Sequence, residues 1–147
     1  IYIVLIVQIL AIGGALFFAK LSKLKGNGFA ISTTLIIWII ICISGYFIQD
    51  KLSVYSVAAF LGFVMGGIQS ISRSTYSKLI PPETKDTASF FSFYDITEKL
   101  AIAIGTLSFG FIDHVTGSMR NSMVFMALFF IAGYILLQMA QLKKNLQ

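Results

Sequence analysis

Four charged residues lie inside long apolar stretches of the chain, where an ionised side chain needs a reason to be. Arg73 lies within the apolar stretch 54–79, and Asp95, Glu98 and Lys99 lie within 88–112. A charge within a lipid-spanning segment is costly, and such residues usually pair with each other or line the pathway of a solute or proton. These four residues are therefore the first candidates for binding, gating or proton transfer.

The polar residues of these two stretches fall on one side of each predicted helix. At 100° per residue, Gln69 and Ser70 share the face of Arg73, and Glu98 and Lys99 share the face of Asp95. Apolar residues occupy the opposite sides. The small residues Gly62, Gly66, Ser70 and Ser74 recur every four positions, a spacing that lets two helix backbones approach closely.

Arg73 and Asp95 are expected at the same depth on neighbouring helices. Each lies 11 residues from Thr84, at the middle of the connection that Pro81 and Pro82 begin. We expect Arg73 to pair with Asp95 or Glu98 inside the bundle, because an unpaired arginine there is unfavourable. The pair could be a gate that opens during transport, a static clamp, or a direct contact for substrate or protons. The candidate substrate and gating residues are Gln69, Ser70, Arg73, Asp95, Glu98 and Lys99.

The elements that carry these residues are predicted to be five membrane-spanning α-helices. Hydrophobic residues make up 57% of the 147 residues and charged residues 12%, with a mean hydropathy of +0.88. Soluble domains have about 25% charged residues, and a bilayer core about 30 Å thick requires about 20 apolar residues per helix. The spans are expected near 1–19, 29–49, 54–79, 88–112 and 121–140, which predicts an all-α polytopic bundle in a single domain.

Basic residues between the spans predict the orientation. Lys20, Lys23, Lys25, Lys78, Lys85, Lys143 and Lys144 fall on one side of the membrane, and Lys51 and Arg120 on the other. Seven against two indicates that the first and third connectors and the C-terminus are cytoplasmic. We expect the protein to lie in the inner (plasma) membrane of a bacterium.

Several other classes of site and partner are not expected. His114 is alone, Cys42 is the single cysteine, and no phosphate-binding loop or hydrolase motif occurs. We predict no metal, no cofactor and no catalytic residue, and the scattered basic residues argue against nucleic acid. The first residue is Ile1, and no basic segment precedes the first apolar stretch, so we expect no signal peptide. We also expect the chain to start partway through a longer protein.

Three segments of the chain resemble a known family. The strings are GGIQSISRSTYSKLIP from Gly66, SFFSFYDITEKLAIAIG from Ser89, and TGSMRNS from Thr116. They are similar to the vacuole-effluxer-like branch of the major facilitator superfamily, which includes vacuolar amino-acid permeases. The resemblance implies that the five spans are helices eight to twelve of a twelve-helix transporter, in its second six-helix repeat.

The favoured function is that of a secondary active transporter moving a small solute by alternating access. The resemblance alone suggests amino acids as substrates. The charges inside the spans make protons a candidate coupling ion, although the sequence does not identify the driving ion. The expected partners are the lipid bilayer, the other half of the same protein and the solute. Two alternatives remain at this stage: a membrane-embedded enzyme that modifies lipids, for which Asp86, Asp95 and Glu98 are the local acids, and a non-catalytic membrane subunit.

Overall fold

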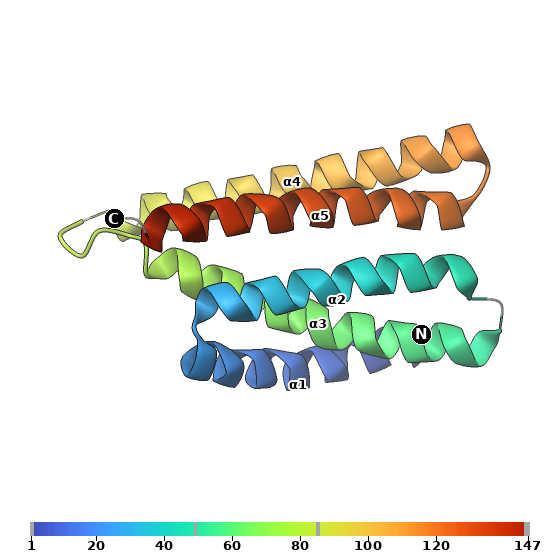
Figure 1. The fold of residues 1–147 in the computed structure, drawn as a ribbon, viewed down its shortest axis with the longest axis horizontal. Helices are drawn as coiled ribbons and strands as arrows, with labels where there is room; N and C mark the ends of the chain where they lie inside the picture. Colours follow the sequence, from blue (N-terminus) through green and yellow to red (C-terminus); the bar gives the residue numbers. More distant parts are fainter. Residues whose placement is uncertain (1, 49, 85, 146–147) are drawn as a thin grey trace.

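The protein forms five long α-helices joined by short connections (Figure 1). The structure is a computed structural model, and it describes residues 2–48, 50–84 and 86–145. The helices are α1 (Tyr2–Lys25), α2 (Asn27–Phe47), α3 (Lys51–Ser77), α4 (Thr87–Thr116) and α5 (Met119–Asn145). They run antiparallel in chain order, and the described residues contain no strand. The predicted all-α bundle is confirmed.

Local sequence explains where the helices begin and end. Gly26 alone separates α1 from α2, and its φ of 89° favours glycine. Asp50 and Asp86 cap α3 and α4, each accepting a hydrogen bond from the backbone N–H three residues later. Gly117 ends α4 in the left-handed conformation, with a φ of 64°.

The first predicted connector differs from the structure. We expected a basic turn over Lys20–Gly28, but α1 continues to Lys25 and α2 begins at Asn27. Lys23 and Lys25 therefore lie in the last turn of α1, where positive charge interacts favourably with the helix dipole. Of the basic residues used to predict orientation, Lys85 lies outside the described residues.

Glycines bring α1 and α3 into backbone contact. A Cβ atom on Gly62 would lie 2.5 Å from the carbonyl oxygen of Val7, and one on Gly66 would lie 1.9 Å from that of Ala11. On the other helix, a Cβ atom on Gly14 would lie 1.7 Å from the carbonyl oxygen of Phe63. The four-residue spacing of Gly62 and Gly66 thus predicts a real helix–helix seam.

Asn27 ties the start of α2 to both of its neighbours. Its Oδ1 accepts hydrogen bonds from Ser22 Oγ (2.5 Å) in α1 and from Lys78 Nζ (3.1 Å), just after α3. Its Nδ2 donates to Thr75 Oγ1 in α3 at 2.7 Å. Because one amide at the start of α2 bonds to residues of both α1 and α3, the ends of these three helices are held together at this end of the bundle.

The helices are arranged in the spatial order α4, α5, α2, α3, α1. The core residues Phe18, Ala30 and Ile71 lie where α1, α2 and α3 meet. By contrast, α3 and α4 are consecutive in the chain but have almost no backbone contact, and no residue of α4 is buried. The space between α3 and α4 is therefore bridged by side chains.

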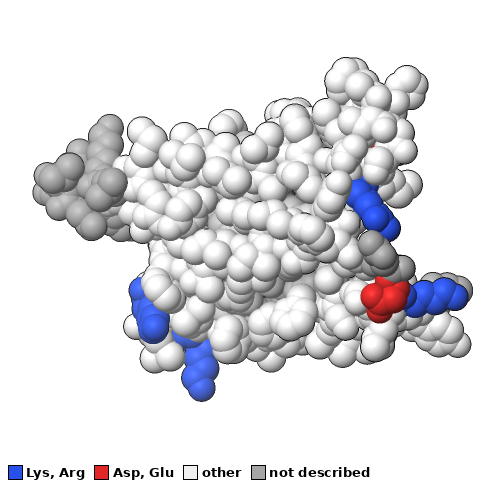
Figure 2. Space-filling view, turned by 45° about the vertical axis from the view of Figure 1, so that its right-hand side comes forward, with Lys and Arg blue, Asp and Glu red and all other residues white. Residues whose placement is uncertain are grey.

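Length and composition support a membrane location for four of the five helices. α1, α2, α3 and residues Met119–Gln141 of α5 are long and apolar enough to cross a bilayer. From the sequence we also expected α4 to span the membrane, as the fourth of five spans. It is long enough but falls outside this group, because the charged residues Asp95, Glu98 and Lys99 interrupt its apolar sequence. Figure 2 shows charged residues gathered at the two ends of the bundle, with an uncharged band between them on this face. The chain is an integral membrane protein.

Candidate solute pocket between α3 and α4

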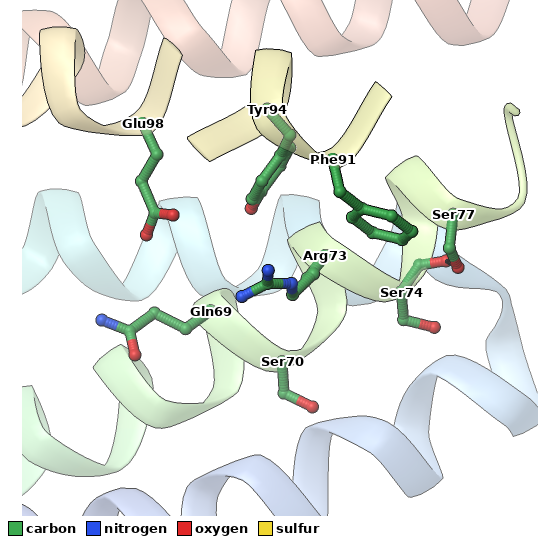
Figure 3. Close-up of a pocket in the computed structure, with 8 residues that line it drawn as sticks. All are labelled: Gln69, Ser70, Arg73, Ser74, Ser77, Phe91, Tyr94 and Glu98. Carbon is green, nitrogen blue, oxygen red and sulfur yellow. Dashed lines mark hydrogen bonds between the residues drawn. The ribbon is translucent and has the colours of Figure 1, made fainter. Parts of the chain in front are cut away.

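A pocket of about 600 Å³ lies between the C-terminal half of α3 and the N-terminal half of α4. It is an open groove at the end of the bundle where the α3–α4 connection lies. The α3 helix contributes polar side chains to it, and α4 contributes two aromatic side chains and one acid (Figure 3). The lining residues are Gln69, Ser70, Arg73, Ser74, Ser77, Phe91, Tyr94 and Glu98.

Arg73 is the central positive charge of this pocket. Its Nη2 donates a hydrogen bond to Asp95 Oδ1 at 3.3 Å, which is also an ion pair. Its guanidinium carbon lies 5.7 Å from the centroid of the Phe91 ring and 6.0 Å from that of Tyr94. Cation–π attraction and the ion pair therefore hold one guanidinium on α3 against three side chains of α4.

Aromatic contacts stabilise this arrangement on the side nearer the connection. The hydroxyl of Tyr76 donates to the carbonyl oxygen of Phe90 at 3.0 Å. The Tyr76 ring lies 5.0 Å from Tyr94 and 6.2 Å from Phe91, measured between centroids. Side chains thus join α3 to α4 where their backbones are apart.

Glu98 and Gln69 complete the polar lining. Figure 3 shows the Glu98 carboxylate, the Gln69 amide and the Arg73 guanidinium directed toward the same space between the two helices. Within the part of the chain that the structure describes, the side chains of Glu98 and Gln69 make no hydrogen bond or ion pair to another residue. One acid, one base and one amide are therefore available to a ligand in this groove.

The predicted site residues are mostly brought together. Gln69, Ser70, Arg73 and Glu98 line the pocket, and Asp95 holds Arg73 from its edge. Lys99 does not line it, and although Lys99 shares a helix face with Asp95, the two form no ion pair within the described residues.

The Arg73–Asp95 pair was correctly predicted, but its burial was not. We expected the pair inside the bundle, and the two side chains are 57% and 42% exposed. The reason is the separation of α3 from α4, which leaves the pair facing an open groove rather than a packed interface.

The sequence reasoning missed the aromatic part of the site. Phe91 and Tyr94 were not among the predicted site residues, because aromatic residues near a helix end usually contact lipid or form an interfacial aromatic belt. In the structure they line the pocket. A signal was present: residues 91, 94 and 98 follow the i, i+3, i+7 spacing of one helix face, the face that also carries Asp95. Ser74 and Ser77 share the pocket face of α3 in the same way.

The chemistry available in the pocket is recognition of charged and polar groups. The planar guanidinium of Arg73 suits a carboxylate or phosphate, and the Glu98 carboxylate suits an ammonium group or a proton. A polytopic helical bundle with charged side chains in an open pocket between two helices has features that are typical of membrane transport proteins.

Comparison with known proteins places the chain in a particular family within that class. The model of the vacuole effluxer Atg22-like family matches residues 1–147, so the chain belongs to this family. An uncharacterized MFS-type transporter, YxiO of Bacillus subtilis (strain 168), is 27% identical over 135 residues, covering 92% of this chain and 31% of that protein. Autophagy-related protein 22-1 of Phaeosphaeria nodorum is 35% identical over 98 residues, covering 67% of this chain and 17% of that protein.

Autophagy-related protein 22 of Eremothecium gossypii is similarly related, with 36% identity over 85 residues, 58% of this chain and 16% of that protein. The chain thus spans less than one third of the length of these relatives. No solved structure gives a significant match. The resemblance to the vacuole-effluxer-like branch of the major facilitator superfamily is confirmed.

Proposed function

We propose that this chain is the C-terminal part of a secondary active transporter that moves a small solute by alternating access. Its five helices would belong to the second six-helix half, and the first half of the same protein would supply the opposite wall of the pathway. Amino acids are the favoured substrate class. The resemblance to vacuolar amino-acid permeases supports this choice. The presence of both Arg73 and Glu98 in one pocket supports it as well, because a zwitterion carries a charge complementary to each.

The observation that carries the proposal is the polar groove between α3 and α4. It has a volume of about 600 Å³, within the range of about 300–1,000 Å³ that small-molecule sites occupy. It contains Arg73, Gln69 and Glu98 within a family of transporters. Packed transmembrane helices without a ligand to accommodate would close such a polar gap with small or apolar side chains.

The Arg73–Asp95 pair acts in this proposal as a gate between α3 and α4. The pair is a single contact at 3.3 Å between helices whose backbones lie apart, and both side chains are accessible. An exposed ion pair is worth about 0.2–1 kcal/mol, which thermal motion or a competing solute carboxylate can overcome. A static clamp would instead require a buried pair with further hydrogen bonds.

Uptake of radiolabelled amino acids into proteoliposomes tests the proposal, using the full-length protein. Arg73→Gln should reduce uptake by at least about tenfold, which corresponds to about 1.4 kcal/mol. Lys51→Gln, which removes an exposed charge at the opposite end of the bundle, is the matched control. Size-exclusion profiles show whether each variant is folded. Normal uptake by folded Arg73→Gln protein would refute the assignment of this pocket, and no flux across a broad amino-acid panel would refute the substrate class.

Proton coupling is assigned in this proposal to Glu98. Its carboxylate faces the pocket without a partner among the described residues, so a proton can reach it. Glu98→Gln replaces the carboxyl group by an amide of nearly the same shape, which cannot carry the proton. The variant should lose the pH dependence of uptake while retaining solute exchange, whereas an unchanged pH profile would exclude Glu98 as the proton carrier.

The proposed topology places the α1–α2 turn, the α3–α4 connection and the C-terminus in the cytoplasm of a bacterium, with the protein in the inner membrane. The excess of lysines at that end of the bundle supports this orientation. Cysteines placed at Lys23 and Lys51 should differ in labelling by an impermeant maleimide in intact cells, with only the Lys51 position reacting. Labelling of the Lys23 position would reverse the topology.

A further inference from the structure

A second polar groove lies on the other side of the bundle, between the N-terminal half of α2 and the C-terminal half of α5. Its volume is about 590 Å³, and it shares no lining residue with the pocket between α3 and α4. Its polar lining consists of Lys25, Ser32, Thr33, Tyr134, Gln138 and Gln141. Phe29 and Ile36, which also line it, are 47% and 44% exposed, so the groove opens at the surface of the helix pair.

The groove is rich in hydrogen-bond donors and contains no acid. The Lys25 ammonium nitrogen lies 4.9 Å from the centroid of the Phe29 ring, which holds it at the rim. Gln138 Nε2 donates to Ser32 Oγ at 3.2 Å, and one of its two N–H groups remains. The sequences of α1, α2 and α5 contain no Asp or Glu. The charge and hydrogen-bonding character of this groove therefore favours an anion.

The first turn of α2 adds to this character. Gly26, the residue before α2, makes no side-chain cap, so N–H groups at the start of the helix are available. Gln141 lies against this turn, since a Cβ on Gly28 would be 2.5 Å from Gln141 Nε2. That amide nitrogen is buried and has no hydrogen-bond partner within the described residues. A hydrogen-bond acceptor at this position would satisfy both the N–H groups of the first turn of α2 and the amide nitrogen of Gln141.

The location of the groove indicates what kind of anion it holds. Both α2 and α5 are apolar enough to span a bilayer, so acyl chains would otherwise cover the half-buried Tyr134 and Gln138. Polar groups facing hydrocarbon without a partner are unfavourable. The groove extends along α2 from Gly28, next to Lys25 at the lysine-rich end, to Ile36, about 12 Å at 1.5 Å per residue. Because the headgroup region is about 5–8 Å thick in each leaflet, a groove of this length reaches from the headgroups past the glycerol esters to the start of the acyl chains.

We propose that this groove binds an anionic phospholipid of the leaflet that Lys25 faces. The lipid phosphate would meet Lys25 and the first turn of α2, and the glycerol ester oxygens would accept hydrogen bonds from Gln138 and Tyr134. Just beyond the groove, Trp38 stacks on Phe130 with centroids 5.0 Å apart, an apolar surface against which the acyl chains pack. The inference rests on the membrane placement of α2 and α5 and not on the solute transported.

Native mass spectrometry of the delipidated full-length protein tests the proposal. Phosphatidylglycerol and phosphatidylcholine are titrated separately, and the apparent affinity of the first bound lipid is measured. The wild-type protein should prefer phosphatidylglycerol, and Lys25→Gln should reduce that preference about fivefold, the effect expected of one lysine at an anionic surface. Lys20→Gln is the matched control, because Lys20 is exposed in the same helix but does not line the groove.

Each outcome of this titration decides the matter. A loss in Lys25→Gln but not in Lys20→Gln supports a defined lipid site. Equal losses would indicate general attraction to the leaflet and overturn the proposal, as would equal binding of the two lipids. Inorganic phosphate that displaces the lipid would assign the groove to a free anion instead. If Lys25→Gln does not fold, Tyr134→Phe removes one hydroxyl from the groove and should weaken phosphatidylglycerol binding, and unchanged binding would overturn the proposal.

Discussion

Replacing Gly66 by alanine would place a methyl group almost on the backbone of the neighbouring helix. The added Cβ would lie 1.9 Å from the carbonyl oxygen of Ala11, whereas ordinary van der Waals contact begins at 3.4 Å, so α1 and α3 would have to separate by about 1.5 Å. The obstacle is helix backbone and not the flexible end of a side chain. The strain cannot be relieved by changing a rotamer.

The expected cost is about 1–3 kcal/mol, the usual range for overpacking. Alanine is the better helix former by about 1 kcal/mol, which offsets part of it. The net loss of up to about 2 kcal/mol would lower the ratio of folded to unfolded protein by a factor of up to about 30. Gly13→Ala is the matched control, since a Cβ at Gly13 meets nothing within 4 Å in the described structure.

Equilibrium unfolding of the purified full-length protein in increasing sodium dodecyl sulfate, followed by circular dichroism, measures both variants. The Gly66→Ala midpoint should fall below that of the wild type, while the Gly13→Ala midpoint should be equal or higher. Equal midpoints for the two variants would refute the backbone-contact explanation, because it predicts opposite effects for the same chemical change.

Three further predictions concern the polar groups. Asn27→Ala removes the hydrogen bonds to Ser22, Thr75 and Lys78 and should destabilise the protein by about 1–3 kcal/mol in the same assay. The same substitution at the exposed Asn121 should have little effect. In a double-mutant cycle, Arg73→Gln and Asp95→Asn should show a coupling below about 1 kcal/mol, because both side chains are largely exposed; several kcal/mol would indicate a buried clamp instead of a gate. The hydrogen bonds from Ser89 lower the pKa of Asp86 from its ordinary value of 3.8, so its contribution to stability is present above that value and is lost as the pH falls through the lowered pKa. Asp86→Asn should flatten this acid dependence, and an unchanged acid limb in a pH series of unfolding curves would contradict the cap assignment.

The parts of the fold that could be predicted follow from composition and periodicity. Long apolar stretches predict helices, and the glycine spacing of α3 predicts its close approach to α1. The equal distances of Arg73 and Asp95 from the connection predict their pairing. These features depend on residue composition and on spacing along the chain, and both can be obtained from one sequence.

Other features depend on how the helices pack, and the sequence could not predict them. Nothing in the residues of α3 and α4 shows that these adjacent helices separate, because α4 packs instead on α5, which follows it. The exposure of the Arg73–Asp95 pair is a result of that separation. The roles of Phe91 and Tyr94 were hidden for a related reason: an aromatic residue near a helix end reads equally well as a lipid contact until the opposing helix is placed.

The two seams of α3 differ in mechanical stiffness. Against α1, backbone meets backbone at glycines, and this side can yield only by breaking the contact altogether. Against α4, the connection consists of exposed and flexible side chains around Arg73, whose individual contributions are each about 1 kcal/mol or less. The α3–α4 groove is therefore expected to widen or narrow more easily than the α1–α3 contact, so a small force on α3 would change the groove before it separated α3 from α1.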